Sequence, residues 1–176
     1  LGMLGMHGLY DANMAMHGCD LMINIGARFD DRITGRLDAF SPDSIKAHID
    51  IDPSSINKVI KTDIPIVGDI AHVLEDVLKV WKSRGRKVNA EAIAKWREKI
   101  AEWRRVDCLK FTQEGPTIKP QYALERLEAL TKGHDRYICT EVGQHQMWAA
   151  QYLGFEDPTR WMTSGGLGTM GYGFPS

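Results

Sequence analysis

Short apolar segments alternate along this chain with segments of helical periodicity, and this alternation limits the folds open to it. Residues 21–25 (Leu-Met-Ile-Asn-Ile) form an apolar run that is typical of a strand buried in a parallel sheet. Apolar and polar residues alternate over 45–51, which predicts a second strand. A third candidate, 64–67, contains Pro65 and is therefore expected at a sheet edge or at a strand start. The pattern predicts an α/β fold with a parallel sheet covered on both faces.

Helical segments separate these strands. Residues 8–19 are compatible with a helix, and Asp69 can cap another whose apolar face comprises Ile70, Val73, Leu74, Val77 and Trp81. Residues 90–111 indicate one long polar helix with a thin apolar stripe, which favours a surface connector over a core element. Residues 113–116 (Gln-Glu-Gly-Pro) break that helix, and we place a domain boundary there.

A second α/β unit begins after this boundary. Pro120 opens a helix that Gly133 ends, and we expect its leucines at positions 124, 127 and 130 to face inward. A strand starts at 137–139, a helix follows residue 143, and 160–163 supplies another strand. This unit is started but not finished within the chain.

Composition excludes several classes of partner. The 176 residues are 43% hydrophobic and 26% charged, with a formal net charge of −1, which favours a globular protein without a nucleic-acid or membrane partner. The basic run 84–87 is best interpreted as a solvated helix end. Three widely spaced cysteines favour free buried thiols over disulfides or a zinc site.

A glycine-dense run, 164–176, is the strongest candidate for ligand binding. Gly166, Gly168 and Gly171 match the spacing of a dinucleotide-binding fingerprint, but Gly173 and Pro175 leave no room for the helix which that fingerprint requires. We therefore favour a backbone cradle for another cofactor. A simple glycine-rich turn is the alternative.

Polar residues follow the predicted strands. Arg28 could clamp a pyrophosphate, although composition alone favours an ion pair with the carboxylates at 30 and 31. The carboxylates of 50–52 end a strand where ribose hydroxyls are often bound, but Asp52 with Pro53 can equally form a turn.

Three further residues have two interpretations each. His7, in a glycine-rich stretch, either contacts a flat ligand or occupies a tight turn incidentally. His145, between two glutamines at a strand-to-helix turn, is either structural or part of a polar site. Met170 is either a core residue or a flexible contact for an aromatic ring.

Five motifs, in this order, resemble those of the catalytic large subunits of acetolactate synthase (acetohydroxyacid synthase), a family of thiamine-diphosphate enzymes. The motifs are Gly-Met-His-Gly at 5–8, Gly-Ala-Arg-Phe-Asp-Asp-Arg at 26–32, His-Ile-Asp-Ile-Asp at 48–52, Gly-Gln-His-Gln-Met-Trp-Ala-Ala-Gln at 143–151, and the glycine run at 163–173. The resemblance spans the whole chain and implies an internal part of a longer catalytic subunit.

The resemblance also implies a domain organisation. Residues 1–86 would form most of a Rossmann-like FAD-binding middle domain, 87–115 a connector helix and linker, and 116–176 the truncated start of the thiamine-diphosphate domain.

The site residues that it implies fall into two sets. The FAD contacts would be Leu4, Gly5, Met6, His7, Gly26, Ala27, Arg28, Phe29, Asp30, Asp50, Ile51, Asp69, Ile70, Gly165 and Gly166. The thiamine-diphosphate contacts would be Gln144, His145, Gly168, Thr169 and Met170, with Met170 beneath the bent cofactor.

The implied reaction joins two 2-keto acids with loss of CO2 and belongs to branched-chain amino-acid biosynthesis. The family's catalytic glutamate would lie upstream and its Mg²⁺ ligands downstream, so we assign no catalytic or metal-binding residue here and expect the chain alone to be inactive. FAD would be structural. A homo-oligomer, a regulatory small subunit, and a cytoplasmic location (plastid or mitochondrial in a eukaryote) are further expectations.

Two other functions stay open on sequence alone. One is a related FAD- and thiamine-dependent carboligase, such as glyoxylate carboligase, or a pyruvate oxidase. The other is a flavin-binding module without catalysis.

Overall fold

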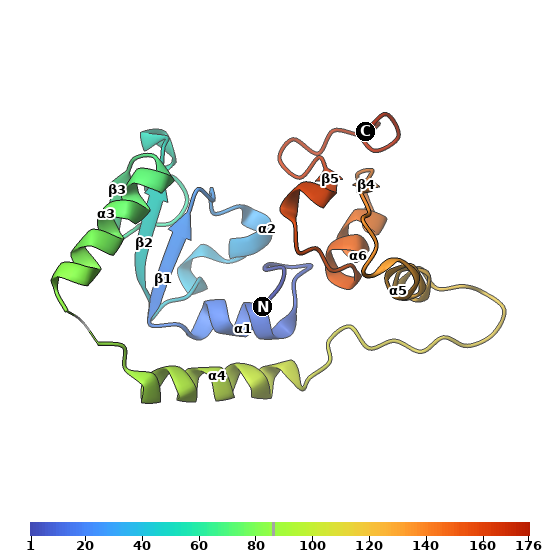
Figure 1. Cartoon of the computed structure of the whole chain (residues 1–176), viewed down its shortest axis with the longest axis horizontal. Helices are drawn as coiled ribbons and strands as arrows, with labels where there is room; N and C mark the ends of the chain where they lie inside the picture. The colour runs from blue at the N-terminus through green and yellow to red at the C-terminus, as the bar shows by residue number, and fades with distance from the viewer. Residues whose placement is uncertain (86) are drawn as a thin grey trace. The chain divides into compact units, whose positions relative to one another are not determined.

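The computed structural model describes residues 1–85 and 87–176, which form two compact units (Figure 1). The first unit ends at Asp107 and the second begins at Cys108. This division falls inside the predicted connector, 87–115. Arg86, which belongs to the basic run and marks the predicted end of the middle domain, lies outside the described residues.

Three parallel strands form the sheet of the first unit, in the order β1-β2-β3 (Figure 1). The strands are β1 (Leu21–Ile25), β2 (Ile45–Asp50) and β3 (Ile64–Val67). The predicted parallel α/β fold is confirmed, and Pro65 lies in an edge strand, where its missing N–H leaves no gap in the ladder. Because the strands are parallel, their carboxyl ends reach one edge of the sheet.

The three longest helices of the first unit lie within the predicted helical segments, whereas the short helices over 31–34, 37–39 and 53–55 were not predicted. The helices of this unit are α1 (Tyr10–Gly18), α2 (Asp31–Thr34), α3 (Ile70–Ser83), α4 (Ala90–Arg104) and the short 3-10 helices η1 (Leu37–Ala39) and η2 (Pro53–Ser55). The Asp69 carboxylate accepts the N–H of Ala71 at 2.9 Å, so the predicted cap of α3 is confirmed. The predicted helix over 90–111 is too long: Asp107 adopts a left-handed φ of 46°, which ends the helical path.

Helix α4 packs against α1 (Figure 1). Arg104 donates from Nε to the buried Asp11 carboxylate at 2.9 Å, and the ring of Trp103 lies over Gly18. The helix interpreted from sequence as a surface connector therefore contributes an ion pair and an aromatic contact to the first unit.

The core of the first unit lies on one side of β1. Phe29, Phe40 and Ile60 form it, with Met16 and Met22 packed against them. The side chains that point the other way from β1, at 21, 23 and 25, stay about half exposed, as does much of the apolar face of α3. The expectation of a sheet covered on both faces is confirmed at the central strand, where residues 46–49 of β2 are buried consecutively, and is wrong at β1, which buries only alternate side chains.

The second unit contains two parallel strands and two helices. Its elements are α5 (Pro120–Thr131), β4 (Ile138–Thr140), α6 (Gln144–Tyr152), the 3-10 helix η3 (Pro158–Arg160) and β5 (Trp161–Thr163). The linker before α5 is held by Tyr152, whose hydroxyl donates to the carbonyl of Leu109 at 2.8 Å. The predicted inward orientation of Leu127 and Leu130 is wrong, since both are exposed.

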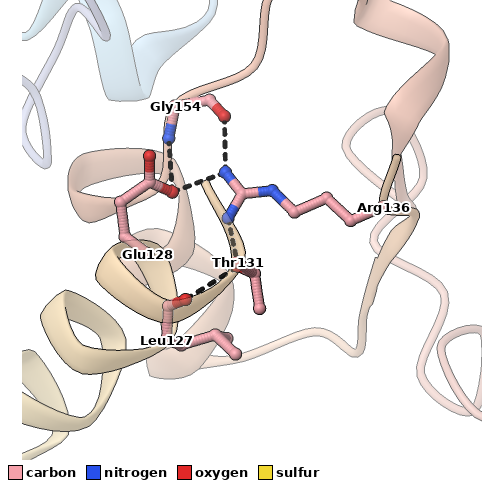
Figure 2. Close-up of polar contacts among 5 residues, drawn as sticks. All are labelled: Leu127, Glu128, Thr131, Arg136 and Gly154. Atoms are coloured by element: carbon pink, nitrogen blue, oxygen red, sulfur yellow. Dashed lines mark hydrogen bonds and ion pairs between the residues drawn. The ribbon is translucent and has the colours of Figure 1, made fainter. Parts of the chain in front are cut away.

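A polar clamp joins α5 to the segment that follows α6 (Figure 2). The Arg136 guanidinium donates to the Thr131 hydroxyl, to the Glu128 carboxylate and, at 2.8 Å, to the Gly154 carbonyl. The Gly154 N–H donates to the same Glu128 carboxylate at 3.3 Å, and the Thr131 hydroxyl donates to the Leu127 carbonyl at 2.7 Å. The side chains of Arg136 and Glu128 are 14% and 20% exposed, so the pair is largely shielded from water.

Replacing Arg136 by Met should lower the free energy of unfolding by about 2–3 kcal/mol, because the Glu128 carboxylate would keep its burial and lose its main donor. Chemical denaturation of the full-length protein measures this. Arg36→Met is the matched control, since Arg36 pairs with Asp38 in the open and its loss should cost less than about 0.5 kcal/mol. Equal effects of the two variants would contradict the clamp.

Acid should weaken the same clamp. Burial raises the pKa of the Glu128 carboxyl, but the hydrogen bonds from Arg136 and Gly154 outweigh it and hold the pKa below the ordinary 4.5. A carboxyl whose pKa is lower in the folded than in the unfolded protein stabilises the fold fully at pH values above its unfolded-state pKa. It loses that contribution as the pH falls through its folded-state pKa. The stability difference between wild type and Glu128→Gln should therefore be constant above pH 4.5 and shrink below it.

Candidate functional site

The carboxyl edge of the first sheet gathers three of the segments that sequence proposed for FAD. The N–H of Gly26 donates to Ile49 O at 2.8 Å, and the N–H of Gly68 donates to Asp50 O at 3.0 Å. These two bonds hold the loops that follow β1 and β3 against the end of β2. Segments 26–30, 50–51 and 69–70 therefore start at one edge, where parallel sheets commonly bind ligands.

The loop after β1 is anchored by one buried ring. Phe29 adopts a left-handed φ of 54° and inserts its side chain into the core, where its ring centroid lies 5.9 Å from that of Phe40 and 5.1 Å from that of His48. Asn24 donates from Nδ2 to Ala27 O at 2.7 Å. With its end buried, the loop leaves Gly26, Ala27 and Arg28 facing solvent.

Asp30 serves as both a helix cap and an ion-pair partner. Its carboxylate accepts the N–H of Arg32 at 3.0 Å at the start of α2 and pairs with Arg28. The pKa of Asp30 is lowered, chiefly by the Arg32 N–H, then by Asp31 and Arg28. The ion pair that composition favoured for Arg28 is thus present, and a phosphate would have to compete with Asp30 for the exposed guanidinium.

The glycine-rich stretch at 2–8 lies against the start of α2. The N–H of Met6 donates to Arg32 O at 2.9 Å, and Asn13 holds Gly5 through two hydrogen bonds of 2.8 Å. A Cβ on Gly5 would approach Arg32 O to 2.5 Å, and the φ of Gly5 is +92°. Leu4 and Met6 are exposed, while His7 is half-buried. This stretch therefore adjoins the segment that carries Asp30.

The carboxylates at the ends of β2 and β3 differ in the hydrogen-bond partners that already occupy them. Asp50 accepts the N–H of Asp52 at 2.9 Å and lies 3.6 Å from Nε2 of the wholly buried His48. Asp52 accepts both the N–H and the hydroxyl of Ser54, which lowers its pKa and makes the turn that sequence offered as the alternative. Ile51, between them, is 70% exposed. Asp69 is used as the cap of α3, with Ile70 opening that helix.

In the second unit, the carboxyl edge of β4 and β5 brings together the two segments proposed for thiamine diphosphate. Gln144 and His145 open α6 directly after β4, and the glycine run follows β5. The hydroxyls of Thr140 and Thr163 lie 2.7 Å apart, and Gln146 donates from Nε2 to the Thr163 hydroxyl at 2.7 Å. This network joins the two strand ends to the first turn of α6.

The glycine run is exposed over 165–171 and has no helix over 164–176. Gly168 and Gly171 adopt left-handed φ values of 63° and 85°, which favour glycine. Thr169 N–H donates to the Ser164 hydroxyl at 2.8 Å. Met170 is 77% exposed, so the alternative that placed it in the core is wrong. Gly165 and Gly166 also face solvent in this second unit.

Several residues that shape these edges were not identified from sequence. Asn13 and Asn24 each hold a loop backbone, and Glu141 binds the glycine run. An asparagine next to a predicted loop was the only available signal for the first two. Within residues 1–85 and 87–176, no group of three or more His, Cys, Asp or Glu side chains could hold a metal ion. Cys108 and Cys139 are exposed, so the prediction of buried cysteines is wrong for them.

No helix in the described part of the chain combines the length and apolar character that a membrane crossing needs. 

Comparison with known proteins gives consistent matches in both units. Residues 1–77 match the family model for the central domain of thiamine pyrophosphate enzymes, and residues 141–176 match that for the C-terminal thiamine pyrophosphate-binding domain. The whole chain is 49% identical to the acetolactate synthase isozyme 3 large subunit of Escherichia coli K12, of which it covers 30%.

Similar matches occur in other organisms. The chain is 47% identical over its whole length to the acetolactate synthase large subunit of Haemophilus influenzae and covers 30% of it. It is 44% identical to that of Porphyra purpurea and covers 29%. The chain thus spans about a third of the length of these relatives.

Replacing Gly5 by Ala should lower the free energy of unfolding by about 1–3 kcal/mol more than Gly35→Ala. Both glycines have positive φ, but an added Cβ meets Arg32 O at position 5 and open space at position 35. Chemical denaturation of the full-length protein measures the difference. Hydrogen exchange over residues 2–8 should rise in Gly5→Ala alone; equal effects of the two variants would show that the loop tolerates the added methyl group.

Proposed function

We propose, from the premise that this chain belongs to the thiamine pyrophosphate enzyme family, that it forms part of an acetolactate synthase large subunit. The whole enzyme would condense two pyruvates, or pyruvate and 2-ketobutyrate, with loss of CO2, in branched-chain amino-acid biosynthesis. The observation that carries this proposal is the placement of Gln144, His145 and the glycine run at one carboxyl edge of β4 and β5. The identity over the full chain length supports it.

The residues of this edge fit thiamine diphosphate. Backbone without a side chain at Gly168 leaves room for a heterocycle to approach closely. The exposed thioether of Met170 is a flexible, polarisable group suited to contact an aromatic ring face. Gln144 and His145 present exposed polar side chains at the first turn of α6. Thr169 completes the set proposed from sequence.

The edge of the first sheet fits FAD. Gly5 and Gly8 let this stretch pack closely on neighbouring main chain, since a Cβ at either position would collide with it. Arg28 supplies an exposed cation for a pyrophosphate, and Asp50 a carboxylate for a hydroxyl group. We assign the remaining FAD contacts as in the sequence analysis. Residues 1–86 would then be most of the FAD domain, 87–115 the connector, and 116–176 the start of the thiamine-diphosphate domain.

In such an enzyme the chain's own residues bind and orient. Thiamine diphosphate supplies an electron sink when bound. Met170 would contact an aromatic ring of the bound cofactor, and Gln144 and His145 would bind its polar groups. The family's catalytic glutamate and Mg²⁺ ligands are assigned to parts of the longer protein outside this chain. FAD would stabilise the fold, because the condensation involves no net redox change.

The partners and location are also proposals. The substrates would be 2-keto acids, and the full-length protein would form a homo-oligomer that could bind a regulatory small subunit. The enzyme would act in the cytoplasm of a bacterium, or in a plastid or mitochondrion of a eukaryote. Bacterial and red-algal relatives are compatible with both settings.

An activity assay tests the proposal. The full-length protein with pyruvate, thiamine diphosphate, Mg²⁺ and FAD should form acetolactate, whereas the 176-residue chain alone should not. Acetolactate from the chain alone would overturn the assignment of the catalytic groups to other regions. Retention of FAD by the full-length protein without affinity for thiamine diphosphate would instead favour a flavin-binding module, and glyoxylate condensation or pyruvate oxidation would favour the related enzymes.

Met170→Ala in the full-length protein should lower kcat/KM for pyruvate at least about tenfold, since it removes a cofactor contact, and should leave the thermal midpoint unchanged because the side chain is exposed. Leu167→Ala is the matched control: this side chain lies in the same run, is also exposed, and is not assigned to the cofactor. Equal activity of the two variants would remove Met170 from the site.

A further inference from the structure

The carboxylate of Glu141, the residue that follows β4, crosses to the glycine run. Its Oε1 accepts the N–H of Val142 at 3.1 Å and the N–H of Tyr172 at 3.1 Å. The second bond joins residues 31 positions apart and connects the two segments proposed for thiamine diphosphate. Glu141 therefore bridges the end of one strand and the loop that follows the other.

Main chain packs against main chain at the same point. A Cβ on Gly173 would lie 2.6 Å from the N of Glu141 and 2.7 Å from the carbonyl carbon of Thr140. Neither neighbour is a flexible side-chain end, so only glycine permits this approach. The loop thus returns to the strand end from which the Glu141 carboxylate extends.

The electrostatics agree with this geometry. Burial raises the pKa of the Glu141 carboxyl, but the backbone N–H groups of Val142, Gly171, Tyr172 and Gly173 outweigh it, and the pKa is lowered. The group is thus an anion at neutral pH, and charge-assisted bonds to backbone N–H groups are stronger than neutral ones.

The rest of the run has few restraints. Residues 165–171 are exposed, and the bond from Thr169 N–H to the Ser164 hydroxyl acts only within the run itself. Glu141 and Gly173 join the run to the strand edge at its far end, just after Met170. The position of the exposed methionine relative to Gln144 and His145 consequently depends on that junction.

We propose that Glu141 is a positioning residue that holds the glycine run in the conformation that receives thiamine diphosphate. It acts through the backbone of 171–173 and performs no proton transfer. This inference rests on the proposed function and adds to it a residue that fixes the shape of the site. Its consequence is that removing the carboxylate weakens cofactor binding while the fold and the FAD site persist.

The test uses three variants of the full-length, FAD-loaded protein. Glu141→Ala removes the acceptor, and Glu141→Gln keeps one oxygen but removes the charge. Asp157→Asn is the matched control, because Asp157 also accepts a backbone N–H, that of Thr159 at 2.8 Å, and also has a lowered pKa, but at η3 and away from the run. If the alanine variant does not fold, the glutamine variant carries the test.

The first measurement is hydrogen exchange over 168–173 without thiamine diphosphate. Exchange should be at least about tenfold faster in Glu141→Ala, intermediate in Glu141→Gln, and unchanged in Asp157→Asn. Equal exchange in all four proteins overturns the proposal whatever the wild type binds, so this arm is independent of the proposed function.

The second measurement is titration with thiamine diphosphate, followed by tryptophan fluorescence and by activity. Its Kd should rise about tenfold in Glu141→Ala, with FAD retained and kcat at saturating cofactor within about twofold of wild type. A fall in kcat at unchanged Kd overturns the positioning role. A wild type that does not bind thiamine diphosphate overturns the proposed function, and with it the cofactor part of this inference, even where the exchange result stands.

Discussion

Parallel strand pairing is the interaction on which both candidate sites depend. When β1, β2 and β3 pair in parallel, every strand leaves the sheet at the same edge, and the loops that follow must begin there. The same holds for β4 and β5. Neither edge needs a motif of consecutive residues to collect its polar groups. Segments 18 or more residues apart in sequence become neighbours because parallel pairing starts their loops at the same edge.

Parallel pairing of the strands does not by itself fix the conformation of the loops. A few buried or hydrogen-bonded side chains fix it. In the first unit the ring of Phe29 occupies the core and pulls its loop into a left-handed conformation, while Asn13 holds the glycine stretch. In the second unit Arg136 and Glu128 join the helices, and Glu141 joins the run to the strand end. These anchors leave bare backbone exposed, which is the surface that a large planar cofactor requires.

The elements with strong local patterns were predictable. The apolar run of β1 and the capped start of α3 appear at the predicted residues, because a strand period and a capping carboxylate depend on neighbours in sequence. The C-terminal end of α4 was not, since Asp107 ends it by a backbone conformation that its type only weakly favours. The outward leucines of α5 were also missed. Helical spacing marks an apolar stripe, but Leu127 and Leu130 of that stripe are exposed, and Glu128 between them bonds Arg136 and Gly154.

For the candidate site residues, too, some properties could be predicted from the sequence and others could not. Their motifs, their order and their family could be read from the sequence alone, because residue identity and spacing carry that information locally. Only the tertiary structure decided that Met170 faces solvent and that Glu141 binds a loop 31 residues away. Exposure and long-range hydrogen bonds depend on where the chain returns in space, and no local pattern of side chains encodes that return.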